Sequence, residues 1–324
     1  MYSNVHAPSG LQASAMDMDS DSGQSGDMQT LQLDDAAIAC SIVYPAVEHA
    51  TSNRCIKAWA AKISQRYAKY AMALCGTLDH TNIQMELRCN EAVADNGILR
   101  MAFRGTLTLP SNEEQAIAET LEFDLASGML LSDAYDASML TQQRPRIALS
   151  FDDGPSQYTD ELLDLLEYYD IPATFFMMGQ HVGGRADTVA RMPKLGCEVA
   201  NHTWNHPDLT KLSDGAIASQ AQRTNHAVEQ ACGVRPRLLR PPYGASDRRI
   251  VRAAGMKCVG WNLDTLDWRL RNADAVYARL MELAKDGSVV LLHDTYRETI
   301  DAMYMAIPDL ILSGYDFVVV SEIY

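Results

Sequence analysis

The chain has 324 residues, 47% of them hydrophobic, and a formal net charge of −15. Its length predicts two domains, because single domains commonly contain about 100–200 residues. An acidic surface repels phosphate backbones and anionic lipids, which excludes nucleic acid and anionic membrane as partners. The sequence contains no run of about 18 apolar residues, so no segment is expected to span a membrane.

Residues 1–30 are predicted to form a disordered acidic leader. No Lys or Arg occurs before Arg54, whereas seven acidic residues do. The Ser, Gly, Asp, Met and Gln content is typical of a solvated tether. The basic and apolar regions of an export signal are missing. Two interpretations remain: a cytoplasmic protein, or an extracellular or cell-envelope protein whose export signal or anchor has been removed. The tether favours the second.

Residues 31–143 are predicted to form a small α+β domain. Ala36–Val47 is strand-like, and Arg54–Leu74 has the three- and four-residue apolar spacing of an amphipathic helix. Turn signals then separate three more strand candidates, Ile83–Cys89, Ile98–Leu109 and Gln115–Phe123. The segment contains no cluster of histidines, cysteines or paired carboxylates that indicates a catalytic site.

Residues 144–324 are predicted to form an α/β domain, a distorted barrel of about seven parallel strands. Apolar strand candidates alternate there with helical patterns, of which Asp160–Tyr169 is the clearest. Such alternation implies a parallel sheet that is covered on its outside. The strand candidates are Arg146–Ser150, Ala173–Met178, Glu198–Ala200, Leu238–Leu239, Lys257–Asn262, Ser288–Leu292 and Asp316–Val320.

Polar constellations follow five of these strands, at the end of a barrel where active sites lie. They are Ser150–Pro155, Asn201–Pro207, Arg240–Gly244, Asp264–Trp268 and His293–Asp294. Each has a structural explanation by itself: a turn, a hydrogen-bonded pair of histidines, a surface ion pair for Arg240, or a core aromatic for Trp268. Five in succession at equivalent positions favour a functional site.

Two imidazoles, His202 and His206, together with one carboxylate form a common ligand set for a catalytic divalent metal. Such an ion acidifies water and polarises a carbonyl group. The adjacent Asp152 and Asp153 repel each other unless a positive group lies beside them. If one of them binds the metal, the other is free to act as a general base.

Two further residue pairs complete a hydrolytic mechanism. Arg240 could hold the general base in place. His293 could be the general acid that protonates a leaving amine, because a buried Asp such as Asp267 fixes the tautomer of a His and adjusts its pKa.

In this order, the five segments resemble the polysaccharide deacetylase family (the NodB-homology domain, carbohydrate esterase family 4) over roughly Arg146–Tyr324. The resemblance implies a distorted barrel that hydrolyses N-acetyl groups of a polysaccharide substrate. The chain departs mildly from the family pattern: Ser150 stands where Thr is usual, and Thr203 where Ser often follows the first His. Neither change removes a metal ligand.

The resemblance also implies the roles of individual residues and the metal. The expected roles are Asp152 as the general base, oriented by Arg240; Asp153, His202 and His206 as metal ligands; the backbone N–H of Tyr243 as an oxyanion donor; Asp267 as the partner of the general acid His293; and Leu291 and Trp268 as walls of the acetyl pocket. The expected metal is zinc, with cobalt, nickel or manganese as alternatives.

The preceding domain is similar to a small α+β domain of the bacterial envelope that occurs before some peptidoglycan deacetylases, through Tyr44-Pro45 and Phe123–Gly128. This similarity favours GlcNAc or MurNAc of peptidoglycan as the substrate and a wall-binding or positioning role for residues 31–143. Three alternatives remain open: a chitin-oligomer deacetylase, a xylan O-acetyl esterase, and a glycan-binding or sensor protein without turnover.

Overall fold

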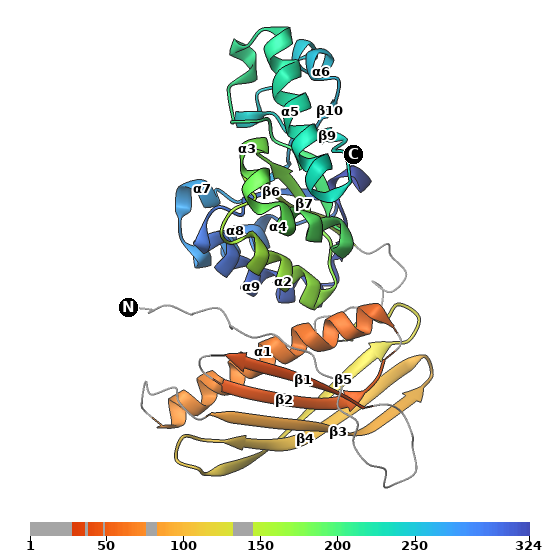
Figure 1. Cartoon of the computed structure of the whole chain (residues 1–324). Helices are drawn as coiled ribbons and strands as arrows, with labels where there is room; N and C mark the ends of the chain where they lie inside the picture. The colour runs from red at the N-terminus through yellow and green to blue at the C-terminus, as the bar shows by residue number, and fades with distance from the viewer. Residues whose placement is uncertain (1–27, 36–37, 48, 76–82, 132–144) are drawn as a thin grey trace. The chain divides into compact units, whose positions relative to one another are not determined.

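The computed structural model describes residues 28–35, 38–47, 49–75, 83–131 and 145–324 (Figure 1). The chain divides into two compact units, Met1–Gln143 with Ile307–Gly314 and Arg144–Ala306 with Tyr315–Tyr324. We call them the N-terminal unit and the C-terminal unit. Residues 1–27 of the predicted leader lie outside the described residues, and its last three, Met28–Thr30, belong to a paired strand, so the leader does not extend to residue 30. Within the described ranges, no helix is long and apolar enough to cross a membrane.

The N-terminal unit is a five-stranded sheet with one long helix, α1, against one face (Figure 1). The strand order is β1-β2-β3-β4-β5. Strands β2 and β3 are parallel, with α1 as the crossover between them, and the other neighbours are antiparallel. The bounds are β1 Met28–Asp35, β2 Ile38–Pro45, α1 Ala50–Cys75, β3 Gln84–Asp95, β4 Ile98–Thr108 and β5 Glu114–Asp124.

Apolar residues at alternate strand positions form the face that the helix covers. Ile42 of β2 is fully buried, and Trp59 of α1 packs against Phe103 of β4 with ring centroids 5.0 Å apart. The predicted helix and four predicted strands are confirmed. Strand β1 was not predicted, because its alternating apolar residues border the acidic leader. Asn96 and Gly97 have φ angles of 49° and 81°, as a two-residue hairpin turn between β3 and β4 requires.

The C-terminal unit is an eight-stranded sheet in which all neighbouring strands are parallel. The order is β10-β9-β8-β7-β6-β12-β11, and β13 pairs with the start of β6. The strands are β6 Arg146–Asp152, β7 Thr174–Met177, β8 Glu198–Asn201, β9 Leu238–Leu239, β10 Lys257–Cys258, β11 Leu263–Asp264, β12 Ser288–His293 and β13 Asp316–Phe317. The helices are α2 Thr159–Tyr169, α3 Gly179–Val182, α4 Ala186–Arg191, α5 Asp214–Cys232, α6 Arg248–Ala254, α7 Asp267–Leu270, α8 Ala273–Leu283 and α9 Arg297–Leu312. This arrangement confirms the predicted distorted barrel of parallel strands.

The central strands are buried on both sides, as their continuous apolar sequences predict. Every residue of β6 after Arg146 is buried, and Phe151 stacks on Phe175 of β7 with ring centroids 5.5 Å apart. Helix α2 buries Leu162 and Leu166, which confirms its predicted apolar face.

The strand predicted at Lys257–Asn262 is wrong in extent. Its pairing stops at Cys258, and β11 begins only at Leu263. Asn262 explains the interruption, because its side chain donates to the Gly287 carbonyl at 2.9 Å and accepts from the Val289 N–H at 2.8 Å. Side-chain hydrogen bonds thus replace part of the regular ladder. Strand β13 likewise ends at Phe317, before the predicted Val320.

Candidate metal centre and active site

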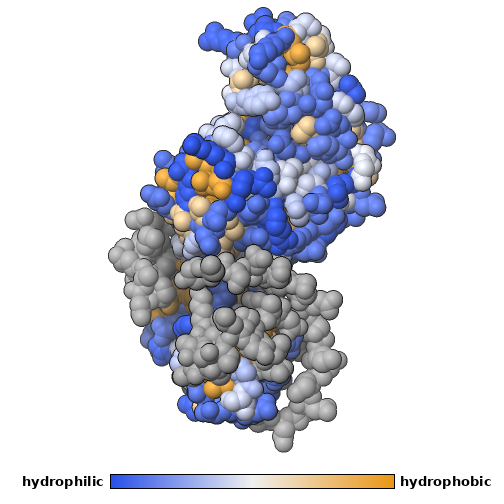
Figure 2. Space-filling model, turned by 90° about the vertical axis from the view of Figure 1, so that its left-hand side faces the viewer, coloured by the Kyte–Doolittle hydropathy of each residue, from blue (hydrophilic) through white to orange (hydrophobic). Residues whose placement is uncertain are grey.

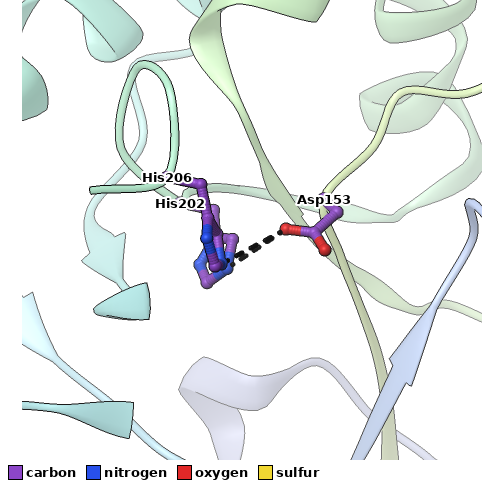
Figure 3. Close-up of side chains that lie close together, drawn as sticks. All are labelled: Asp153, His202 and His206. Carbon is purple, nitrogen blue, oxygen red and sulfur yellow. Dashed lines mark ion pairs between the residues drawn. The ribbon is translucent and has the colours of Figure 1, made fainter. Parts of the chain in front are cut away.

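Asp153 and two histidines converge where β6 and β8 end (Figure 3). Because neighbouring strands are parallel, their carboxyl ends lie along one edge of the sheet. The Oδ1 atom of Asp153 lies 3.5 Å from His202 Nε2 and 3.6 Å from His206 Nε2. Ligands about 2.0–2.2 Å from a tetrahedral zinc ion are themselves roughly 3.3–3.6 Å apart. The three side chains therefore have the spacing of metal ligands.

The chemical state of these groups also fits a cation. Asp153 Oδ1 is buried and accepts no hydrogen bond from the described residues. Burial lowers the pKa of His206, and the nearby His202 lowers it further, so the imidazole stays neutral as a metal ligand requires. His202 donates from Nδ1 to the Arg240 carbonyl at 2.7 Å, which leaves its Nε2 lone pair directed toward Asp153.

Local hydrogen bonds support unusual backbone angles in the two ligand loops. The φ angles are 71° at Asp153, 69° at Thr203 and 59° at His206, a region that non-glycine residues seldom occupy and that clusters at functional sites. Thr203 accepts from the His206 N–H at 3.1 Å, and its own N–H donates to Asn201 Oδ1 at 2.7 Å. His181 donates from Nδ1 to the Asp153 carbonyl at 3.0 Å.

A buried ion pair lies beside this cluster. Asp152 is 2% exposed, and its Oδ1 accepts from Arg240 Nη1 at 2.7 Å. Arg240 is 0% exposed, donates from Nη2 to the Gly260 carbonyl at 2.8 Å, and lies over the Phe176 ring with Cζ 4.0 Å from the centroid. Arg240 is thus no surface ion pair. Its guanidinium is the counter-charge that allows a carboxylate to be buried there.

His293, the last residue of β12, and Asp267, the first residue of α7, form a second hydrogen-bonded pair. His293 donates from Nδ1 to Asp267 Oδ1 at 2.8 Å, and its backbone N–H donates to Oδ2 at 2.7 Å. Thr299 and the Trp268 N–H also donate to Asp267, each at 2.8 Å. Burial alone would lower the pKa of His293, but the hydrogen bond and charge of Asp267 and the charges of the two adjacent aspartates raise it to about 9. His293 is therefore an imidazolium at neutral pH.

The two pairs are held at neighbouring positions of the sheet. In the register of β6 against β12, Asp152 is the partner of His293. The remaining predicted residues lie at the same edge. The Tyr243 ring is 70% exposed and contacts the His206 ring edge-on with centroids 4.7 Å apart. Leu291 is buried in β12.

Trp268 is exposed on α7, so it is not a core aromatic. Figure 2 shows a mainly hydrophilic surface on the C-terminal unit, with small hydrophobic groups scattered over it. The exposed large apolar residues of α7 are Trp268 and Leu270. Exposed apolar residues beside a catalytic cluster are typical of a ligand-contacting surface.

No pattern in the sequence assigns a role to Asp294, although it follows His293 directly. It is completely buried, and burial raises its pKa to about 7. Thr159 donates to its Oδ2 at 2.5 Å, and Ser156 donates to its backbone carbonyl at 2.5 Å. Asp294 thereby joins the loop after β12 to the loop that carries Asp153. Only its position beside a predicted general acid could have suggested this from the sequence.

The C-terminal unit is similar to proteins of one family. A family model described as polysaccharide deacetylase matches residues 140–259. The peptidoglycan-N-acetylglucosamine deacetylase PgdA of Listeria monocytogenes is 38% identical over 180 residues, which are 55% of this chain and 39% of that protein. A chitooligosaccharide deacetylase of Bradyrhizobium sp. is 35% identical over 155 residues, which are 46% of this chain and 71% of that protein. The solved structure of the peptidoglycan deacetylase PdaC from Bacillus subtilis has a TM-score of 0.55 and 40% identity, and the match covers 56% of this chain and 90% of that chain.

The chain belongs to the polysaccharide deacetylase family. This confirms the family that the five motifs indicated. The matched region spans less than half the length of the Listeria protein.

Proposed function

We propose that this protein is a metal-dependent deacetylase that hydrolyses N-acetyl groups on GlcNAc or MurNAc of peptidoglycan and releases acetate. The observation that carries the proposal is the Asp153–His202–His206 cluster beside a buried carboxylate–guanidinium pair, with His293 opposite Asp152 in the sheet. The peptidoglycan deacetylases among the similar proteins support the substrate. They also support a location in the cell envelope.

A divalent ion, which we propose to be zinc, would be held by Asp153, His202 and His206 and would act as a Lewis acid on the acetyl oxygen and on water. Asp152 removes a proton from the attacking water as its oxygen bonds to the acetyl carbon. Arg240 keeps Asp152 in position. We assign the stabilisation of the developing oxyanion to the backbone N–H of Tyr243. Leu291 and Trp268 line the pocket for the acetyl methyl group.

His293 supplies the proton that completes the reaction. The C–N bond breaks as His293 delivers its proton to the nitrogen, which leaves as an amine, and the acyl fragment leaves as acetate. An amide nitrogen is a poor leaving group until it is protonated, so this step requires a positioned acid. The hydrogen bond from Nδ1 to Asp267 fixes the ring and leaves Nε2 as the proton donor.

For residues 31–143 we propose a positioning or wall-binding role that contributes no catalytic group, with residues 144–324 as the catalytic domain. A chain that begins near Gln143 should then deacetylate a small soluble substrate as fast as the full chain. A folded but inactive shortened chain would contradict this division.

Acetate release from purified peptidoglycan, with mass spectrometry of the products, tests the proposed activity. Chitin oligomers serve as the comparison, because the Bradyrhizobium relative favours them as the second candidate substrate. Asp152→Asn is the matched variant, because it keeps the shape of the side chain and all metal ligands. We expect it to lose about 10²–10⁴-fold in rate while binding the metal normally. Acetate release at near-normal rate from Asp152→Asn would contradict the mechanism.

A further inference from the structure

A cationic side chain lies one aromatic ring away from the proposed general acid. The Tyr296 ring centroid is 5.7 Å from the His293 ring centroid. The Arg271 guanidinium lies over the same tyrosine ring, with Cζ 4.1 Å from the centroid. Burial raises the pKa of Tyr296, and the charges of Asp153 and Asp267 raise it further. The phenol therefore lies in the negative electrostatic potential of the site. Stacking on the ring holds the guanidinium in place at little cost in side-chain entropy.

Glu298 accepts hydrogen bonds from Arg271 but does not use all of its donors. The Nε and Nη2 atoms of Arg271 donate to the Glu298 carboxylate at 3.1–3.5 Å. Among the described residues, Nη1 has no hydrogen-bond partner, and 48% of the Arg271 side chain is exposed. One edge of the guanidinium therefore remains open to a ligand.

The proposed substrate has a variable group close to the leaving nitrogen. In a 2-acetamido sugar, the nitrogen that accepts the His293 proton is on C2, and the neighbouring carbon bears O3. In GlcNAc, O3 is a hydroxyl. In MurNAc, it carries a lactyl ether, which ends in a free carboxylate where no peptide is attached. This carboxylate is only a few bonds from the nitrogen that faces His293, within reach of a guanidinium one ring away. Arginine binds carboxylates through directed, charge-assisted hydrogen bonds.

Resting on the deacetylase activity proposed above, we propose that Arg271, held on Tyr296, is a specificity-determining residue that binds the lactyl carboxylate of MurNAc. The enzyme then prefers MurNAc with a free carboxylate to GlcNAc. Glu298 opposes this preference, because it competes for the same guanidinium.

Four soluble substrates test the assignment: chitotetraose, the peptide-free (GlcNAc–MurNAc)₂ tetrasaccharide, the same tetrasaccharide with its lactyl carboxylates converted to methyl amides, and its peptide-bearing form. The last distinguishes peptide carboxylates from the lactyl one. For each, kcat/KM is measured by acetate release, and the deacetylated sugar is identified by mass spectrometry. The variants are Arg271→Gln and Glu298→Gln. Arg235→Gln is the control. Arg235 lies beyond the end of α5, is also exposed, and is also paired with a glutamate, Glu229.

We expect the wild type to prefer the charged tetrasaccharide over its methyl amide by about three- to tenfold, the range for a partly exposed charged hydrogen bond. Arg271→Gln should abolish this preference and keep the rate on chitotetraose. Glu298→Gln should increase it, and Arg235→Gln should leave it unchanged. The proposal is overturned if the wild type does not prefer the charged tetrasaccharide, or if it does so only when the peptide is attached. It is also overturned if Arg271→Gln lowers kcat/KM by the same factor on every substrate. Failure of the wild type to release acetate from any of the four would instead refute the deacetylase activity itself.

Discussion

Replacing Arg240 by alanine should remove most of the stability of the C-terminal unit. Asp152 is 2% exposed and Arg240 is 0% exposed, so the substitution leaves a buried carboxylate without its counter-charge. Breaking a buried pair in this way costs about 3–5 kcal/mol. The Gly260 carbonyl also loses its donor, which costs about 1–3 kcal/mol more. A domain is typically stable by only about 5–15 kcal/mol, so Arg240→Ala should be largely unfolded.

The double variant Asp152→Asn/Arg240→Met separates stability from chemistry. Replacing both charges of a buried pair by groups of similar size is often neutral for stability. We therefore expect the double variant to recover the about 3–5 kcal/mol that the unpaired Asp152 charge costs, but not the lost donor of the Gly260 carbonyl, and to release no acetate, because it has no general base. Restored folding in a variant that stays inactive would assign two separate roles to one ion pair.

Differential scanning calorimetry of the full chain in the presence of EDTA measures these changes, because bound metal would add its own stabilisation. The two units call for separate analysis of each transition, since a single two-state fit does not apply. A loss of less than about 1 kcal/mol in Arg240→Ala would refute the reasoning. It would mean that water or another cation compensates the Asp152 charge.

Four further outcomes are expected. His206→Ala should weaken metal binding more than about 100-fold, beyond the usual effect of outer-sphere changes, and metal analysis of the folded variant checks this. The acid must be protonated, so kcat/KM should be highest below the His293 pKa of about 9 and fall above it. In Asp267→Asn that fall should begin at lower pH. An unshifted profile would exclude Asp267 as the cause of the raised His293 pKa. A Cβ at Gly154 would clash with both Asp294 carboxylate oxygens, so Gly154→Ala should destabilise by about 1–3 kcal/mol, and adding Asp294→Ala should recover part of that loss in thermal unfolding. His293→Ala should lose most activity on an N-acetylated sugar but much less on an activated acetyl ester, whereas equal losses would show that His293 is not the leaving-group acid.

The sequence was enough to predict that most candidate site residues lie at one edge of the sheet, because a parallel sheet brings the carboxyl ends of its strands together. The apolar strand before Asp152 and the one before His293 each ended in polar residues, which sufficed to place both at one edge. The sequence could not predict which polar side chains of the site are buried. Arg240 could have been a surface residue, and only the packed structure shows the guanidinium enclosed against Phe176.

Contacts between distant residues without a recognisable pattern escaped prediction. Asp294 had no periodicity or spacing to mark it, and its bond to Thr159 depends on how two loops fold over each other. The same holds for Arg271 on Tyr296. In the N-terminal unit, β1 was missed because local composition near the acidic leader outweighed a short apolar alternation.

The register of β6 against β12 has a consequence for how this protein can diversify. Asp152 and His293 are paired across two adjacent strands, so the hydrogen-bonded ladder sets the spacing between the proposed base and acid. Tyr243, Trp268 and Arg271 do not set that spacing, whereas Asp267, which precedes Trp268, holds the His293 ring. Exchanges around these three residues that keep Arg240 and Asp267 can therefore change which glycan is accepted without moving the proposed base and acid. Chimeras that graft such segments from related deacetylases should keep turnover and acquire the donor's preference.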